Sequence, residues 1–248
     1  MSTENTIKVL DHGFVTLRNL SGPTRRFWNE SGVSERAFDA DDTDPANTAR
    51  MSFNQTDSGR TRDQDLKLAD YLMRNKHTTP FEMIEVWLEM KMPIFIARQF
   101  VRHRTCSINE VSGRYVTLPA EWYIPEVVGG KPANAKQGQD DNLGAETQEW
   151  FKLILNGECE ASYEAYLEAI ERGVAAEHAR MLLHLNHYTH WIWKQDLWNL
   201  MHFLSLRMDS HAQVEAQAYA NAIYQLVRQH LPESMSVFDK YVRIDRSK

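Results

Sequence analysis

Residues 98–114 carry the densest set of side chains that could bind a charged ligand. Four arginines fall in this segment: Arg98, Arg102, Arg104 and Arg114. A guanidinium binds phosphate oxygens in pairs, so such a group at the end of a helix and along a loop suits a phosphate-rich ligand. Ser112 and the amides around Gly113 could donate to the same phosphate. The alternative is a solvated basic face with local ion pairs, since Glu110 lies among the arginines.

Two further places in the sequence have charged residues that could contact a ligand. Glu177 and Arg180 lie three residues apart on a predicted helix, which suits either an ordinary salt bridge or a ligand contact. Arg207 comes at a predicted helix end, just before Ser210. An arginine there can simply complement the helix dipole, or it can hold a fixed guanidinium against a ligand.

Metal and thiol chemistry have weaker support. His184, His187 and His190 suggest a metal site, but positions i and i+6 of a continuous helix face different directions, and no carboxylate completes the set, so we predict no metal. Cys106 has no partnered base nearby, which disfavours covalent cysteine catalysis. Trp191 and Trp193 are typical of a core or an interface.

Composition restricts the class of protein. The net charge of −6 disfavours a protein that coats nucleic acid. Two distant cysteines form neither a disulfide framework nor a zinc site, and the polar start of the chain lacks a signal-peptide core. Without a long apolar stretch we expect no membrane span, and we expect a cytoplasmic protein.

The elements that must position these residues can be read from hydrophobic periodicity. Apolar spacing predicts a helix over residues 62–76, and alternation predicts a strand over 82–92 with one buried face. Pro93 suits the first turn of a helix over 94–103, and a loop over 104–118 follows. Residues 9–20 could hold a strand, and residues 39–48 are typical of an exposed loop with solvated acidic residues.

The rest of the chain, after residue 147, has a helical pattern. Helices are predicted over 150–172, ended by Gly173, and over 174–185. Asp196 can N-cap a third helix through Leu206, and Ser210 can cap a fourth to His230. Residues 129–146 are expected to form a surface loop or insertion. We therefore predict one domain over residues 1–248, of class α+β, with an antiparallel-type sheet packed against a helical C-terminal half.

Four segments together resemble one enzyme family. Residues 102–104 read Arg-His-Arg, and Ser112 follows after seven intervening residues, which is the motif RHRxxxxxxxS of flavin-dependent thymidylate synthases. Residues 109–115, 77–82, 49–53 and 206–213 are similar to the same family, in which these segments follow the same order along the chain. The resemblance runs from about residue 46 to 225.

The resemblance implies a homotetramer with active sites shared between subunits, in dTTP biosynthesis. It implies reductive methylation of dUMP to dTMP, with 5,10-methylenetetrahydrofolate as carbon donor and NADPH, through FAD, as reductant. The cofactor-binding positions that it implies are Thr79, Arg102, His103, Arg104, Glu110, Asp196, Trp198, His202 and, near flavin and folate, His77. The implied dUMP contacts are Gln99, Arg102, Glu110, Val111, Ser112, Gly113, Arg114, Arg180 and Arg207.

Arg207 is the implied catalytic residue, because it would stabilise the uracil ring ionised at N3. Trp198 departs from the family, whose members carry a basic or histidine side chain there, so stacking or a backbone contact would replace a polar one. Three other interpretations remain at this point. They are a nucleotide- or RNA-binding protein without catalysis, a metal-dependent helical enzyme that uses residues 184–190, and a flavin- and folate-dependent uridine methylase acting on RNA.

Overall fold

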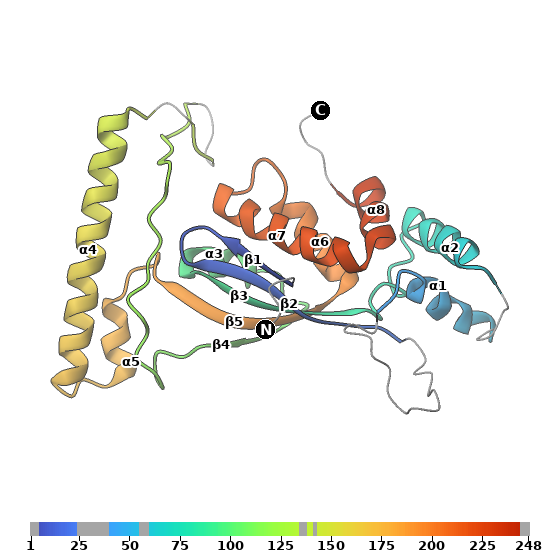
Figure 1. Cartoon of the computed structure of the whole chain (residues 1–248), viewed down its shortest axis with the longest axis horizontal. Helices are drawn as coiled ribbons and strands as arrows, with labels where there is room; N and C mark the ends of the chain where they lie inside the picture. The colour runs from blue at the N-terminus through green and yellow to red at the C-terminus, as the bar shows by residue number, and fades with distance from the viewer. Residues whose placement is uncertain (1–4, 24–39, 55–59, 134–137, 141–142, 244–248) are drawn as a thin grey trace.

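A computed structural model describes residues 5–23, 40–54, 60–133, 138–140 and 143–243. Its centre is an antiparallel sheet in the order β1-β2-β3-β5-β4 (Figure 1). The strands are β1 (Thr6–Val9), β2 (Gly13–Ser21), β3 (Glu85–Pro93), β4 (Ser107–Glu110) and β5 (Tyr188–Asp196). The predicted class, an antiparallel sheet with a helical C-terminal half, is confirmed.

The predicted strand over 82–92 is β3, and its alternation decides which face is buried. Val86, Leu88, Met90 and Met92 are all 0% exposed, whereas Trp87 on the opposite face is 39% exposed. The strand begins later than expected because residues 78–84 form consecutive turns, with the N–H of Phe81 bonded to the carbonyl of Thr78.

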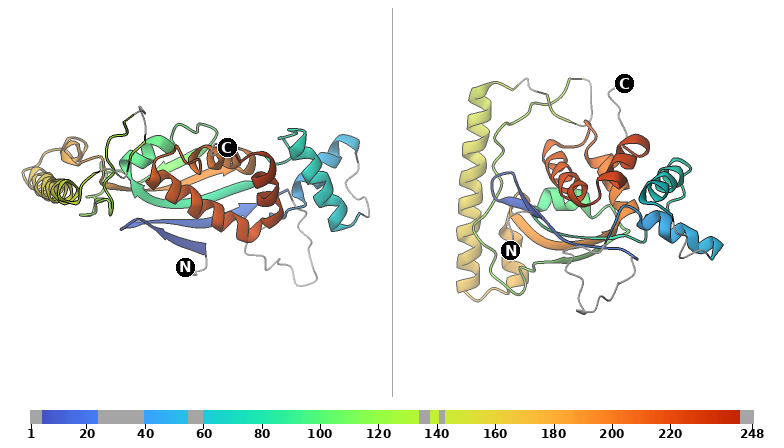
Figure 2. Two further views of the ribbon diagram at one scale, coloured as in Figure 1. Left: turned by 90° about the horizontal axis from the view of Figure 1, so that it is seen from above. Right: turned by 45° about the vertical axis from the view of Figure 1, so that its right-hand side comes forward.

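The C-terminal helices cover the buried face of the sheet (Figures 1 and 2). They are α6 (Leu197–Arg207), α7 (Val214–His230) and α8 (Pro232–Tyr241). The short α3 (Ile94–Phe100), from the first half of the chain, packs with them. Phe100, Trp193 and Phe203 meet in this core, with ring centroids of Trp193 and Phe203 4.9 Å apart. The core therefore lies directly beneath the ends of α3 and α6, and it fixes where those ends point.

Two predicted helices in the first half of the chain have the expected residues and shorter bounds. The one predicted over 62–76 is α2 (Arg62–Arg74), which begins with a capping box between Thr61 and Gln64. The one predicted over 94–103 is α3, which ends at Phe100.

The acidic segment 39–48 was wrongly predicted to be a solvated loop. Its described part contains α1 (Asp44–Ala49), followed by the 3-10 helix η2 (Arg50–Phe53), and Asp42 is 2% exposed. Asp42 accepts from the N–H groups of Glu233 and Ser234, at 3.1 and 2.8 Å, at the start of α8. A carboxylate satisfies the free N–H groups of a helix start, which explains its burial.

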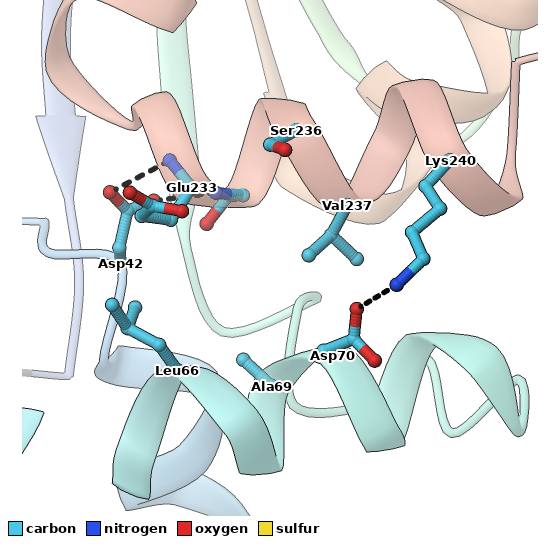
Figure 3. Close-up of a pocket in the computed structure, with 9 residues that line it drawn as sticks. Asp42, Leu66, Ala69, Asp70, Glu233, Ser236, Val237 and Lys240 are labelled. Carbon is cyan, nitrogen blue, oxygen red and sulfur yellow. Dashed lines mark hydrogen bonds and ion pairs between the residues drawn. The ribbon is translucent and has the colours of Figure 1, made fainter. Parts of the chain in front are cut away.

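Figure 3 shows the small pocket, of about 140 Å³, that this contact helps to close between α2 and α8. At its other end the Lys240 ammonium lies 2.9 Å from a carboxylate oxygen of Asp70. These contacts join two helices that are far apart in the chain, so we assign the pocket a structural role.

The structure differs from the prediction in four further places. The segment 188–196, predicted within a helical region, is the strand β5, in which Trp191, Trp193 and Gln195 alternate as buried residues. The helix predicted over 174–185 is reduced to α5 (Ala176–Ala179) and the 3-10 helix η3 (Arg180–Leu182). The loop predicted over 104–118 contains the edge strand β4, and α8 was not foreseen.

Helix starts were predicted with mixed success. Asp196 caps α6 as expected, since its carboxylate accepts from the Asn199 N–H at 2.9 Å. Ser210 does not cap α7, which begins at Val214, because Asp209 instead accepts from the backbone N–H of His211 and holds a turn there.

The long helix α4 (Ala145–Glu171) stands at one side of the molecule (Figure 1). The helix predicted over 150–172 is thus confirmed and begins earlier. The expected surface loop over 129–146 gives way to α4 at Ala145, and its described part holds only an isolated bridge between Gly130 and Asp140. Residues 134–137 and 141–142 lie outside the described residues.

Candidate active site

The arginine-rich segment follows the end of α3. Arg98 and Gln99 lie in the last turn of that helix, Arg102, His103 and Arg104 come just past it, and β4 then leads to the turn at 111–114. None of Arg98, Arg102 and Arg104 forms an ion pair with a described residue. The alternative of local pairing with Glu110 is wrong, because Glu110 instead accepts a hydrogen bond from the Thr189 hydroxyl.

Arg207 lies where three helices meet: the ends of α3 and α6 and the start of α7. Its Nη2 donates to the backbone carbonyl oxygen of Gln99 at 3.1 Å. That carbonyl belongs to the last turn of α3, where no intrahelical N–H is available to it. Within the described part of the chain, the Nε of Arg207 is buried without a hydrogen-bond partner, and no carboxylate pairs with this guanidinium. Burial lowers the pKa of Arg207 below its usual range, yet an arginine remains charged.

Two histidines stand beside this arginine. The rings of His103 and His202 have centroids 6.0 Å apart, and His103 also packs edge-on against Phe203 at 4.9 Å. Burial, together with the charges of Arg207 and His202, lowers the pKa of His103 to about 4. His103 is therefore a neutral ring at pH 7, able to donate from one nitrogen and accept at the other.

A second cluster forms around the turn after β4. A β-carbon at Gly113 would lie 3.4 Å from Cδ of Arg180, so the arginine stem packs against this glycine. The predicted salt bridge between Glu177 and Arg180 is wrong. The Glu177 carboxylate lies 3.7 Å from Arg114, while the Arg180 side chain donates to the Glu177 backbone carbonyl, at 3.4 Å. The Ser112 hydroxyl accepts from the Arg114 N–H at 3.2 Å, which holds the turn.

His77 and Thr79 line a third place, a cavity of about 850 Å³ beside α2. The sequence did not predict most of the residues that line it. Residues 49–53, one of the segments that resemble the family, were the signal that could have indicated them. Its other lining residues include Arg50, Phe53, Arg60, Tyr71 and Lys76. Aromatic and cationic side chains therefore meet in one cavity.

The second and third of these places are not close to one another in a single chain. The helix α5, which precedes Arg180, and the helix α2, which precedes His77, lie at opposite ends of the molecule (Figures 1 and 2). The chain thus brings together Gln99, His103, His202 and Arg207, and separately Gly113, Arg114 and Arg180. It does not bring His77 and Thr79 to Arg180.

Two remaining sequence-predicted residues lie at the start of α6. Both carboxylate oxygens of Asp196 are engaged by Asn199, one by its N–H at 2.9 Å and one by its side-chain amide at 2.7 Å. Trp198 is partly buried against the core and lies one helical turn before His202, on the same side of the helix.

The three histidines considered as metal ligands do not share a helix. His184 lies in a loop and His187 is buried in an isolated bridge with Trp122. His190 is on β5, where its ring lies 2.8 Å from Glu89. In the described part of the chain, no three histidine, cysteine, aspartate or glutamate side chains gather as a metal site would require, and no helix could cross a membrane.

Comparison with known proteins decides the family. Residues 36–233 match the family described as thymidylate synthase complementing protein. The chain belongs to this family. It is 42% identical over 237 residues to a flavin-dependent thymidylate synthase of Thermus thermophilus, covering 96% of this chain and 79% of that one. It is 40% identical over 236 residues to the enzyme of the same name from Ehrlichia ruminantium strain Gardel, covering 94% and 73%.

A solved structure agrees. The UMP/dUMP methylase PolB from Streptomyces cacaoi, bound with 5-Br dUMP, has a TM-score of 0.78 to this chain. It is 25% identical, and the match covers 96% of this chain and 100% of that one. The resemblance seen in the sequence motifs is thus confirmed, and so is the enzyme class, a flavin-dependent thymidylate synthase.

Proposed function

We propose that this enzyme reductively methylates dUMP to dTMP in dTTP biosynthesis. The carbon donor is 5,10-methylenetetrahydrofolate, and NADPH supplies the electrons through FAD. The observation that carries the proposal is Arg207, a half-buried guanidinium with no carboxylate partner among the described residues and an unpartnered buried Nε. A fixed cation of this kind is suited to an anionic ligand in a dry site.

Different residues of the chain contact the uracil ring and the phosphate of the nucleotide. Arg207 stabilises negative charge on the uracil ring at N3, which makes C5 more nucleophilic toward the one-carbon unit. Arg102, Arg114 and Arg180 counter the phosphate, and Ser112 donates to it from the turn after β4. Gln99, Glu110, Val111 and Gly113 shape the rest of the dUMP site.

The cofactor residues fit a dinucleotide with a pyrophosphate. Arg102 and Arg104 are exposed cations without an ion pair to a described residue, and Thr79 adds a hydroxyl donor. The neutral ring of His103 offers an uncharged contact, His202 adds a second ring beside it, and Trp198 offers an aromatic face. Because the Asp196 carboxylate is already engaged, we assign it the role of fixing the start of α6. When bound, the flavin supplies the hydride that completes the methyl group.

The cavity beside His77 suits the folate. Tyr71 and Phe53 present apolar ring surface, and Arg60 and Lys76 can attract the carboxylates of a glutamate tail. Its volume of about 850 Å³ is within the range of small-molecule sites.

We further propose a homotetramer with shared active sites in the cytoplasm. The separation of His77 from Arg180 within one chain supports sites completed by a second subunit. Helix α4 supports an interface, because it buries only Cys159 and Tyr166 and leaves Trp150 and Leu153 at 59% and 74% exposure. Tyr166 of α4 also accepts from the Leu118 N–H, so this helix is tied to the segment that follows Arg114.

The test is a spectrum of the purified protein followed by anaerobic addition of NADPH, with and without dUMP. A flavin spectrum bleached by NADPH at a rate that depends on dUMP, and dTMP formed on adding the folate, is the expected result. UMP and a uridine-containing RNA serve as competing substrates, since a ribonucleotide-specific product would favour the rival methylase. A colourless protein that binds no FAD would favour the noncatalytic nucleotide-binding protein.

A further inference from the structure

Gln213 makes a side-chain contact that none of the roles above explains. Its Oε1 accepts from the Nε2 of Gln99 at 2.6 Å. The backbone carbonyl of Gln99 meanwhile accepts from Arg207 at 3.1 Å. The same residue of α3 is therefore held at its carbonyl by the end of α6 and at its side chain by the start of α7.

The partner that holds the Gln99 side chain is itself firmly placed. Gln213 is the residue just before α7, and its carbonyl accepts the first helical bond, from the Gln217 N–H at 2.9 Å. The Gln217 side chain donates to the Ala212 carbonyl at 2.7 Å, which closes the turn. Behind these residues, Ala216 and Tyr219 are fully buried. Gln213 thus presents its acceptor from a rigid support.

This contact determines which groups of the Gln99 amide remain available. A free glutamine side chain rotates among several rotamers, and ordering it on binding costs conformational entropy. Once one N–H is donated to Gln213, the Oε1 and the second N–H have fixed directions, on a residue whose backbone carbonyl accepts from Arg207. A ligand that meets Arg207 would then meet an amide that is already oriented.

We propose that Gln213 is a positioning residue for dUMP binding, which acts by holding the side-chain amide of Gln99, the residue whose backbone carbonyl accepts from Arg207. The inference rests on the proposed function, since it takes Gln99 and Arg207 as dUMP contacts. Gln213 itself need not touch the nucleotide.

The experiment is a double-mutant cycle on dUMP binding by the FAD-loaded enzyme. The variants are Gln213→Met, Gln99→Met and the double variant, because methionine keeps the length of the side chain and removes its amide. Each single variant should raise the Kd for dUMP about fivefold to tenfold, the effect expected for one lost hydrogen bond and its ordering. The double variant should be no weaker than Gln99→Met, because the two residues act through one contact.

Steady-state kinetics separate positioning from a merely structural role. For Gln213→Met the KM for dUMP should rise while kcat stays within about twofold, as expected for lost ground-state binding. The matched control is Gln225→Met, an exposed glutamine about 18 Å further along α7, which should behave as the wild type.

Three results would overturn the inference: unchanged dUMP binding by Gln213→Met, single effects that multiply in the double variant, or equal losses with Gln225→Met. A wild-type enzyme that neither binds dUMP nor forms dTMP would overturn the proposed function itself. A fully active wild type with an unaffected Gln213→Met variant would remove only the role of Gln213.

Discussion

Replacing Arg207 by alanine tests the central element of the site. The guanidinium carries a full charge, and within the described chain it donates a hydrogen bond to the Gln99 carbonyl. Loss of one preorganised donor that stabilises developing negative charge costs about 10²- to 10³-fold in rate. Because Arg207 contributes a charge as well as donors, we expect the rate of dTMP formation at saturating dUMP to fall by about 10³-fold.

The same substitution should leave the fold intact. Its structural cost is one hydrogen bond, about 1 kcal/mol, and removal of a half-buried charge without a carboxylate partner offsets part of this. We therefore expect the free energy of unfolding to change by less than about 2 kcal/mol. Flavin content should remain that of the wild type.

The assay is anaerobic single turnover with reduced enzyme, dUMP and the folate, with dTMP measured by chromatography. Arg207→Lys is the companion variant: it keeps the charge, but a compact ammonium cannot contact the Gln99 carbonyl and a ligand as a planar guanidinium can, so it should recover only part of the rate. Turnover by Arg207→Ala within about tenfold of the wild type, with full flavin content, would refute the assigned role.

Three other predictions follow from particular contacts. His187 is 2% exposed, and burial lowers its pKa to about 4. Between pH 6.5 and pH 4, His187 therefore binds a proton in the unfolded chain but stays neutral in the folded chain. The free energy of unfolding should therefore fall from pH 6.5 toward pH 4, by at most about 3 kcal/mol from this residue, and urea titrations should show a flatter profile for His187→Phe. Asp65→Asn should cost about 3–5 kcal/mol of stability in the same titrations, because it leaves the buried Arg50 without its ionic partner; a loss below about 1 kcal/mol would contradict this. Ser112→Ala should raise the KM for dUMP with little change in kcat, whereas complete loss of chemistry at saturating dUMP would indicate a covalent or proton-transfer role.

Local sequence was sufficient where one short segment contains the whole cause. The alternation in residues 84–92 fixed the buried face of β3, and the capping side chains of Thr61 and Asp196 fixed the starts of α2 and α6. The Arg-His-Arg and Ser112 spacing was enough to indicate the family, because these positions must lie at one helix end and the loop after it.

The sequence pattern was misleading where residues far away in the chain decide the secondary structure or the burial of a segment. β5 became a strand because it pairs with β3 and because its Trp193 ring packs against Phe203 of α6. Asp42 became buried because α8 begins beside it. Pairing with β5 likewise made β4 a strand within the expected loop.

The sequence by itself determined the chemistry, a set of arginines for a phosphorylated ligand and a family whose members use a flavin. Only the tertiary structure decided which of these residues meet. The ends of α3 and α6 and the start of α7 meet at Arg207 and Gln99, while α5, which precedes Arg180, and α2, which precedes His77, lie at opposite ends of the molecule. The physical reason is that helix ends are placed by packing against the sheet, and that packing depends on residues far from the motif.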